Sequence, residues 1–505
     1  MRRSTRHLAA AAAAVLATTL LAAAPAAAAG PTHHGIDWQP CAEVDPVEEV
    51  DCATITVPLD YSKPWGEKIE IGLARRQAAN PDEKLGTILM DPGGPGGSGV
   101  EVVKQVNVLT GEAAERFDLV GFDPRGVNSS TQVLCGEDAM GAVASIGVPT
   151  DQESFESLEA ANSALTDDCR ERTGELFDHV SNLETVEDME RIRRALGEGK
   201  LNYLGYSYGT IMGQQYAERY PRHIRTMVLD GNMDHSLEST WDFMSTETAP
   251  VEENFDAFAD WCESEPECAL HGQDVRAGYA DLKASARAGE LVDPYTGEPL
   301  DFYGLTGIYT FAANFPQDWP LLAEDYAAML AGESLPGTSQ LQEPEAVENL
   351  FYPAWCSDYG FEIADFAELD ALQGKLAAEY PDVEWTPYDE FALACVGSGI
   401  ENTNERGELD IDHAPELLFI GNEHDFATVY EWSETASAQA DGNLLTYEGY
   451  LHTIYGGTSE CIDDLTNAYF VERAVPDEGA SCPNLDFPGA TVLSERRLPG
   501  AVSPY

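Results

Sequence analysis

The sequence predicts an α/β protein in which a mostly parallel sheet has helices on both faces and a mostly helical insertion interrupts the chain. Three observations support this fold class. Short apolar runs alternate with helical patterns up to about residue 235, the middle third is rich in aromatic and acidic residues with few strand signals, and strand-like runs return after residue 405. Strands that alternate with helices are typical of a parallel sheet covered on both faces.

The predicted elements follow this order along the chain. Apolar runs bounded by Gly, Asp or Pro predict strands at residues 69–75, 86–90, 117–122, 201–205 and 226–230, with a helix over 186–196. Helical patterns cover 275–288 and 320–330, and strand patterns resume at 416–421 and 443–446. We therefore expect a first core segment at 30–235, a helical cap insertion at 236–405 and a second core segment at 406–505.

The first 29 residues predict a secretory signal peptide. Three arginines lie within the first six residues, an apolar run without acids covers 8–21, and three alanines at 27–29 supply a cleavage site. After this segment the sequence has no run of 18 apolar residues, which is the length that a helix needs to span a bilayer. We therefore expect a mature chain that is secreted, extracellular and not bound to a membrane.

The charge of the chain restricts its partners. Asp and Glu number 89 against 28 Lys and Arg, which gives a formal net charge of −61. Such a charge repels phosphates and nucleic acid, so no nucleic-acid partner is expected. It also keeps the chain soluble at the expense of repulsion within the fold, and adaptation to a salt-rich habitat would explain it. We further expect the chain to be a monomer.

The cysteines predict disulfides rather than a metal site. An even number of cysteines in an exported protein favours disulfides, and connecting nearest neighbours along the chain closes five short loops. No Cys-x-x-Cys or His-x-x-x-His spacing supports a metal, and none is expected. The predicted pairs are Cys41 with Cys52, Cys135 with Cys169, Cys262 with Cys268, Cys356 with Cys395 and Cys461 with Cys482.

One motif predicts a nucleophile. Gly-Tyr-Ser-Tyr-Gly at residues 205–209 is the single G-x-S-x-G of the chain, and it follows an apolar run and precedes a segment compatible with a helix. A strained strand-to-helix turn needs small residues beside the serine. We therefore predict that Ser207 is a nucleophile, which requires a base that is held by an acid.

The base and the acid follow from the order Ser, acid, His that this arrangement uses. Of the ten histidines, His452 alone lies beyond the last strand signal. Three acids can partner it: Asp425, which follows the first strand-like run after the insertion, Asp230, which ends the strand before the insertion, and Glu423. We favour Asp425, because Thr428 can donate a hydrogen bond that orients its carboxylate.

A glycine-rich loop admits two interpretations. Residues 90–100, Met-Asp-Pro-Gly-Gly-Pro-Gly-Gly-Ser-Gly-Val, contain a literal G-x-G-x-x-G after a strand, the spacing of a dinucleotide-binding loop. An exported acidic protein rarely meets a dinucleotide, and Pro95 has no N–H for a phosphate. We interpret the loop as part of an oxyanion hole, with the backbone N–H groups of Gly94 and Tyr208 as donors, and we expect no cofactor.

These motifs together resemble a known family. The glycine-rich loop, Phe-Asp-Pro-Arg-Gly at 122–126, Gly-Tyr-Ser-Tyr-Gly-Thr at 205–210, Val-Leu-Asp-Gly at 228–231 and Asp425-x-x-Thr428 are similar to the exported tripeptidyl aminopeptidase branch of the proline-iminopeptidase-like α/β-hydrolases. The resemblance implies an α/β-hydrolase fold with a helical cap and a serine exopeptidase that acts on peptides with a free N-terminus. Two positions depart from it: Val429 stands where members usually have Pro, and Leu451 where they often have Gly.

An exopeptidase must recognise an α-ammonium group, for which carboxylates in the cap are the natural counter-charge. Residues 247–267 contain eight acids and no base, most of which we interpret as a solvated face, and Asp358 is an inward candidate. Two other functions stay open. One is an esterase or lipid hydrolase with the same triad, and the other is a secreted binding protein that keeps the fold without turnover.

Overall fold

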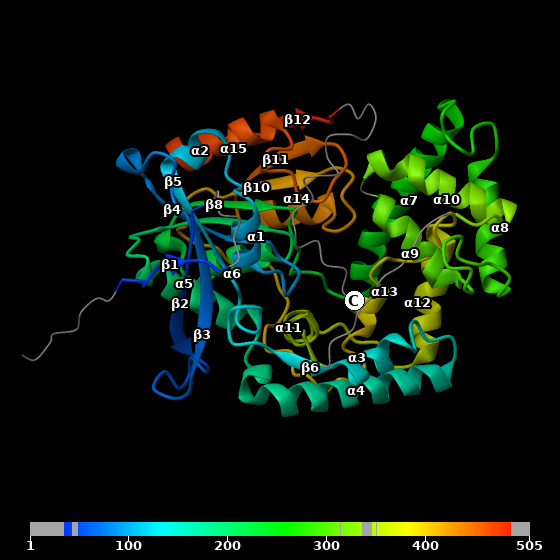
Figure 1. The fold of residues 1–505 in the computed structure, drawn as a ribbon, viewed down its shortest axis with the longest axis horizontal. Coiled ribbons are helices and arrows are strands. Elements are labelled where there is room, and N and C mark those ends of the chain that lie inside the picture. Colours follow the sequence, from blue (N-terminus) through cyan, green and yellow to red (C-terminus); the bar gives the residue numbers. More distant parts are fainter. Residues whose placement is uncertain (1–34, 43–48, 314, 336–345, 350, 486–505) are drawn as a thin grey trace, which may run out of the picture. The chain divides into compact units, whose positions relative to one another are not determined.

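The computed structural model describes residues 35–42, 49–313, 315–335, 346–349 and 351–485, so the predicted signal peptide lies outside the described residues. The strands of the main sheet are β1 (Gln39–Pro40), β2 (Val50–Pro58), β3 (Lys68–Arg76), β4 (Gly86–Asp91), β5 (Phe117–Phe122), β7 (Leu201–Tyr206), β8 (Ile224–Asp230), β10 (Leu418–Asn422), β11 (Asn443–Glu448) and β12 (Ser481–Pro483). Their order across the sheet is β1-β2-β3-β5-β4-β7-β8-β10-β11-β12 (Figure 1).

The sheet is parallel from β5 to β12 and antiparallel from β1 to β5. The seven strands that the sequence predicts are all present, with ends that differ by at most two residues. β2 is missing from the predicted set, because Asp51, Thr54 and Thr56 interrupt its apolar residues. The alternation of strands with helices therefore begins only at β4.

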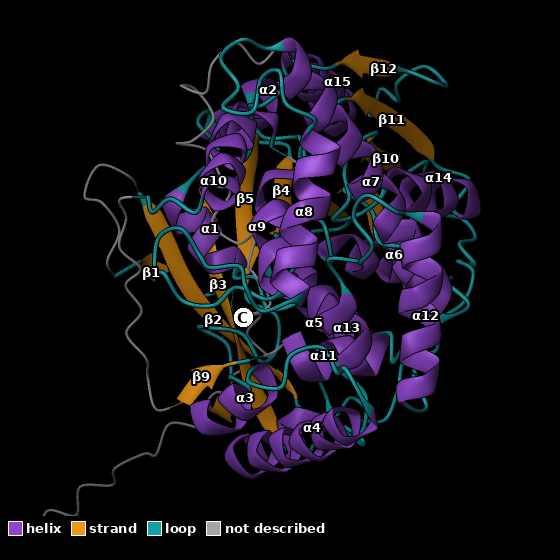
Figure 2. Ribbon diagram, turned by 90° about the vertical axis from the view of Figure 1, so that its right-hand side faces the viewer, coloured by secondary structure: helices purple, strands orange, loops and turns teal. Residues whose placement is uncertain are grey.

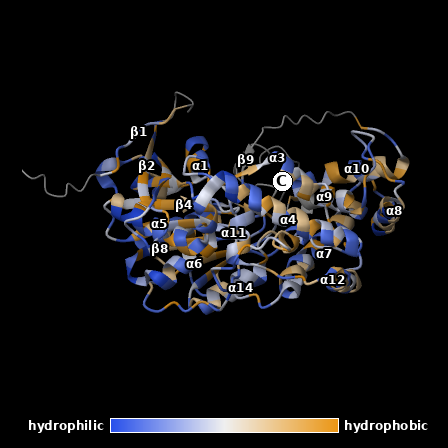
Figure 3. Ribbon diagram, turned by 90° about the horizontal axis from the view of Figure 1, so that it is seen from below, coloured by the Kyte–Doolittle hydropathy of each residue, from blue (hydrophilic) through white to orange (hydrophobic). Residues whose placement is uncertain are grey.

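Helices cover both faces of this sheet. They are α1 (Gly99–Gln105), α2 (Gly111–Arg116) and α15 (Glu460–Glu472) on one face and α5 (Asn182–Ala195), α6 (Gly209–Arg219) and α14 (Tyr430–Gln439) on the other. Val103 and Phe470 belong to the buried cluster of the first face, and Ile192 and Trp432 to that of the second. β4, β5 and β7 are buried along their whole length, as strands with helices on both faces must be. The ribbon of β4 has the orange colour of hydrophobic residues in Figure 3.

The chain between β8 and β10 adds helices to the fold (Figure 2). They are α7 (Thr240–Ser264), α8 (Val275–Arg287), α9 (Phe302–Ala313), α10 (Trp319–Ala331), α11 (Phe351–Asp358), α12 (Phe366–Glu379) and α13 (Asp389–Leu393). Among the described residues of this segment the one strand is β9 (Ala346–Glu348), which pairs with β6 (Leu134–Gly136) outside the main sheet. We call residues 236–405 the cap.

The first core segment also contains α3 (Glu137–Ala144) and α4 (Gln152–Thr173), which, like α1 and α2, the sequence does not predict. α4 is missing from the predicted set because charged and small polar residues dominate its sequence. Its start has a local signal, since Asp151 Oδ1 accepts a hydrogen bond from the Ser154 N–H at 2.8 Å. Four short 3₁₀ helices complete the described elements: η1 (Pro81–Glu83), η2 (Gly174–Asp178), η3 (Pro221–His223) and η4 (Pro316–Asp318).

All ten cysteines form disulfides, and the five pairs are those that nearest-neighbour pairing predicts. The longest loop, between Cys356 and Cys395, spans 39 residues, and the shortest, between Cys262 and Cys268, spans 6. In the part of the chain that the structure describes, the helices are too short or too polar to cross a membrane.

Candidate active site

Ser207 occupies the tight turn between β7 and α6. Its backbone has φ +52°, a conformation that residues with a Cβ rarely adopt. The glycines on either side are required by close approach: a Cβ at Gly205 would lie 2.5 Å from the Gly209 carbonyl oxygen, and one at Gly209 would lie 2.9 Å from the carbonyl oxygen of Asp91. The G-x-S-x-G pattern therefore follows from the packing of this turn.

His452 and Asp425 come together at the same edge of the sheet. Asp425 lies in the loop between β10 and α14, His452 follows β11, and the His452 Nδ1 is 2.9 Å from Asp425 Oδ2. The buried Asp425 carboxylate also accepts hydrogen bonds from the Ala427 N–H (2.8 Å) and the Thr428 hydroxyl (3.0 Å). Ser207 follows β7 at this edge, because β7, β8, β10 and β11 are neighbours and the carboxyl ends of parallel strands meet at one edge.

The environment of His452 favours its protonated form. Burial of the imidazole opposes protonation, but the charge of Asp425, its hydrogen bond and the charge of Asp230 together raise the pKa of His452 above its usual value. A base whose conjugate acid is stabilised in this way is suited to take a proton from a hydroxyl group.

The two other candidate acids lie differently. Asp230 is buried, and its Oδ2 accepts hydrogen bonds from the backbone N–H groups of Ile454 (2.9 Å) and Tyr455 (2.8 Å). Glu423 is exposed to solvent. Of the three acids considered from the sequence, the structure therefore brings Asp425 into a hydrogen bond with the His452 ring.

The glycine-rich loop passes directly against the Ser207 turn. A Cβ at Gly93 would lie 2.6 Å from the Tyr206 carbonyl oxygen and 2.8 Å from the Tyr208 nitrogen, so Gly93 is the residue of closest approach, which no pattern in the sequence distinguishes from its glycine neighbours. The Asp91 carboxylate holds it by accepting from the Gly93 N–H at 2.9 Å. Among the described residues, none accepts a hydrogen bond from the N–H groups of Gly94 or Tyr208.

Asp358, the inward candidate from the cap, is fully buried at the end of α11. Its carboxylate accepts hydrogen bonds from the Tyr208 hydroxyl (2.5 Å), the Asn404 side chain (2.7 Å) and the Asn182 N–H (2.9 Å). Burial raises the pKa of Asp358 to about 7, and these donors oppose the rise. The donors all belong to the chain itself, so Asp358 connects the cap to the residue that follows Ser207.

Glu247 of α7 is a second buried carboxylate of the cap. It is 1% exposed, and no described residue donates a hydrogen bond to either of its carboxylate oxygens. Burial, together with the charge of Asp425, raises its pKa well above the usual value. A signal for it exists in the sequence, because Glu247 falls on the apolar stripe of its helix with Met244 and Val251.

α7 contacts the loop that carries Asp425. The Asn254 side chain donates to the His424 carbonyl oxygen at 2.9 Å, and the Trp432 indole N–H donates to the Thr246 hydroxyl at 3.1 Å. These bonds hold α7 against the loop and against α14, and at this position Glu247 lies within reach of the charge of Asp425.

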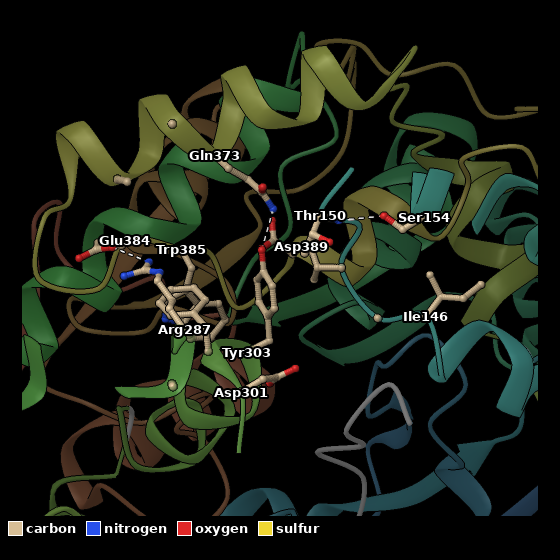
Figure 4. Close-up of a pocket in the computed structure, with 16 residues that line it drawn as sticks. Ile146, Thr150, Ser154, Arg287, Asp301, Tyr303, Gln373, Glu384, Trp385 and Asp389 are labelled. Carbon is tan, nitrogen blue, oxygen red and sulfur yellow. Dashed lines mark hydrogen bonds and ion pairs between the residues drawn. The ribbon is translucent and has the colours of Figure 1, made fainter. Parts of the chain in front are cut away.

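A cavity of about 600 Å³ lies elsewhere, between the cap and the start of α4 (Figure 4). Its lining includes Tyr303, Gln373, Trp385 and Asp389, but neither Ser207 nor the two residues that pair beside it. Asp389 is buried, and none of the described residues donates to its carboxylate oxygens with normal geometry; the neighbouring Gln373 side chain donates to the Tyr303 hydroxyl instead (3.2 Å). The described residues contain no group of three or more His, Cys, Asp or Glu side chains placed to hold a metal.

Comparison with known proteins adds independent findings. Family models match the chain over residues 86–329, described as the alpha/beta hydrolase fold, and over residues 385–482, described as TAP-like protein. The chain is 28% identical over 470 residues to tripeptidyl aminopeptidase of Streptomyces coelicolor, which covers 89% of this chain and 86% of that protein.

Two mycobacterial relatives show a similar degree of identity. The chain is 27% identical over 481 residues to serine protease Hip1 of Mycobacterium tuberculosis, covering 88% of this chain and 91% of that protein. It is 28% identical over 484 residues to carboxylesterase B of the same species, covering 88% and 89%. The names of these relatives include both peptidases and an esterase.

Proposed function

We propose that this chain, which belongs to the α/β-hydrolase family and contains its TAP-like region, is a secreted serine exopeptidase that acts on peptides with a free N-terminus. The observation that carries the proposal is the 2.9 Å contact between His452 and Asp425 at the sheet edge where Ser207 turns from β7 into α6. Relatives named tripeptidyl aminopeptidase and serine protease support the substrate class.

The geometry implies the following reaction. His452 takes the proton of the Ser207 hydroxyl as its oxygen attacks the peptide carbonyl carbon, and Asp425 stabilises the imidazolium that forms. The N–H groups of Tyr208 and Gly94 donate to the oxyanion. His452 then gives the proton to the departing amine, and a water molecule hydrolyses the acyl-enzyme by the same steps. No cofactor takes part in this scheme.

A buried carboxylate supports recognition of a free N-terminus. Glu247 lies near Asp425 without a donor of its own among the described residues, and an α-ammonium group would supply the missing counter-charge. Asp358 fits this part less well, because three donors of the chain already bind it. We therefore propose Glu247, in place of Asp358, as the residue that binds the substrate amine.

Glu247→Gln tests this assignment. With a tripeptide nitroanilide we expect KM to rise by about tenfold or more, because a hydrogen-bonded ionic contact contributes about 1.5–3 kcal/mol. Glu263→Gln changes an exposed acid of the same helix, so it serves as the matched control and should leave KM unchanged. Equal KM in parent and Glu247→Gln would remove Glu247 from the site.

An esterase is the second candidate, because one relative is named carboxylesterase B. The two functions separate when a tripeptide nitroanilide, its N-acetylated form and a simple acyl ester are compared. The exopeptidase proposal expects strong preference for the free amine. Turnover of the acetylated peptide at the same rate would defeat it, and preference for the ester would favour the esterase.

A fluorophosphonate probe tests turnover itself. It should label the parent and fail to label Ser207→Ala, whereas a binding protein without catalysis would resist labelling in both.

Export is tested separately: the chain recovered from culture medium should begin at Gly30, and its five disulfides are compatible with an oxidising compartment. Gel filtration of this material checks the expected monomer.

A further inference from the structure

We propose that Asp230 is a positioning residue that fixes the nucleophile and the base relative to each other. Its backbone carbonyl group acts on the nucleophile, and its side-chain carboxylate acts on the loop of the base. The inference rests on the proposed function, because it concerns the same Ser207 and His452. Asp230 is the last residue of β8, the strand that lies between the strand leading to Ser207 and the strand leading to Asp425.

The two ends of Asp230 bind the two halves of the site. Its carbonyl oxygen accepts a hydrogen bond from the Ser207 N–H at 2.9 Å. Its carboxylate Oδ2 accepts from the N–H groups of Ile454 at 2.9 Å and Tyr455 at 2.8 Å, just beyond His452. A shift of β8 would therefore move the nucleophile and the base together, and loss of the carboxylate would release the base alone.

The loop that carries His452 needs such a restraint. The residues on either side of the histidine, Leu451 and Thr453, have φ values of +94° and +61°, which side chains with a Cβ rarely adopt. Backbone in these conformations persists only where surrounding contacts hold it. Asn422 donates to the Leu451 carbonyl oxygen at 2.7 Å on one side, and Asp230 binds the loop on the other.

The packing around this loop is also close. A Cβ at Gly231, the residue after Asp230, would lie 3.4 Å from His452 Cε1 and 2.8 Å from the Thr428 hydroxyl oxygen. The Tyr206 hydroxyl donates to the Tyr455 carbonyl oxygen at 3.0 Å. A displacement of this loop would change the distance of the imidazole from Ser207.

Charge gives Asp230 a second effect on His452. The ionisable groups that face the imidazole are Asp425, from the loop after β10, and Asp230, from β8. Those that face Asp230 are His452, Asp425 and Tyr206. Burial raises the pKa of Asp230 to about 7, the two backbone donors and His452 oppose the rise, and Asp425 adds to it. Because the charge of Asp230 helps to raise the pKa of His452, its removal should lower that pKa.

Two substitutions separate the restraint from the charge. Asp230→Asn keeps an oxygen that can accept from Ile454 and Tyr455 but removes the charge, and Asp230→Ala removes both. The matched control is Asp234→Asn, a buried acid four residues on whose carboxylate binds Ser236. The readout is the rate of fluorophosphonate labelling of Ser207 as a function of pH, which depends on no particular peptide.

For Asp230→Asn we expect the acid limb of the labelling profile to move to lower pH while the plateau falls less than tenfold. For Asp230→Ala we expect the plateau to fall by about 10²-fold, the effect of misplacing a reacting group by about 1 Å. Asp234→Asn should follow the parent. A role that is merely structural would lower the plateau without moving the acid limb.

The proposal is overturned if Asp230→Asn, melting as the parent does, keeps both the plateau and the acid limb. Should Asp230→Ala fail to fold, the nearly isosteric Asn variant decides alone. Failure of the proposed function gives a different result, because Ser207→Ala would then still be labelled, or the parent would not be labelled at all.

Discussion

Buried carboxylates have different surroundings in two regions of this molecule. At the sheet edge, Asp425 and Asp230 each accept at least two hydrogen bonds from the chain, and so does Asp358, the cap residue that meets this edge at Tyr208. In the cap, Glu247 and Asp389 are just as buried, yet the described residues donate none to their oxygens. Burying a carboxylate without donors costs several kcal/mol unless it is protonated or binds a ligand.

The difference follows from the backbone. Loops at the carboxyl ends of strands have N–H groups that no ladder uses, and these bind Asp230 and Asp425. Inside the cap, Glu247 lies in the interior of α7, where the helix uses its own N–H groups, so this acid on an apolar helix face finds few donors. Satisfied acids are therefore suited to hold a geometry, whereas unsatisfied ones are suited to bind a cation or to remain neutral.

The largest effect is expected at Asp425, one of the buried carboxylates that accept hydrogen bonds from the chain. Asp425→Asn should leave melting unchanged but misorient the His452 imidazole, and in serine proteases the equivalent change lowers kcat by about 10⁴. Steady-state kinetics on a tripeptide nitroanilide measures it. The exposed Glu423→Gln serves as control and should match the parent; an active Asp425→Asn would show that the acid has been assigned to the wrong residue.

Among the buried carboxylates that receive no hydrogen bond, Asp389 is expected to destabilise the fold, so Asp389→Asn should stabilise the protein. Burial raises the pKa of Asp389 from 3.8 to about 7, and the charge of Glu390 adds to the rise. The unfolded chain therefore ionises from about pH 4 while the folded protein stays protonated, so stability falls as pH rises toward 7. At 1.36 kcal/mol per pKa unit, the variant should recover up to roughly 4 kcal/mol at pH 8.

Urea denaturation at pH 5 and pH 8 checks this expectation, because the gain must grow between the two. Asp370→Asn, an exposed acid on α12, is the control and should show no such growth. A gain that is equal at both pH values would mean that Asp389 is paired in the folded protein.

A smaller effect is expected when a satisfied acid loses one donor. Tyr208→Phe removes the hydroxyl that donates to Asp358 at 2.5 Å but keeps the Tyr208 N–H. Leaving a buried acceptor short of a partner costs about 1–3 kcal/mol. Urea denaturation should show this loss of stability, and kcat should change little. Unaltered stability would mean that the Tyr208 hydroxyl does not stabilise the Asp358 carboxylate.

The smallest effect concerns the acids at the surface, which belong to neither group. With a net charge of −61, repulsion between surface acids should weaken the fold at low ionic strength. Raising salt from about 0.01 M to about 1 M shortens the screening length from roughly 30 Å to roughly 3 Å, so Tm should rise by a few degrees. A flat or falling Tm would contradict adaptation to salt.

Much of the fold is readable from local patterns. The apolar runs predict seven strands of the main sheet, and short loops between neighbouring cysteines predict the five disulfides. β2 and α4 escape prediction because polar residues obscure their periodicity. The boundaries of the cap as a domain stay a prediction.

The sequence by itself determined that a serine lies in a strand-to-helix turn, because the glycines beside Ser207 are a local steric requirement. It also favoured Asp425 over Asp230 through Thr428, three residues away. Only the tertiary structure decided which acids are satisfied. Hydrogen-bond partners are chosen through space, and Asp230 meets Ile454 across 224 residues of chain, a distance that no pattern along the sequence records.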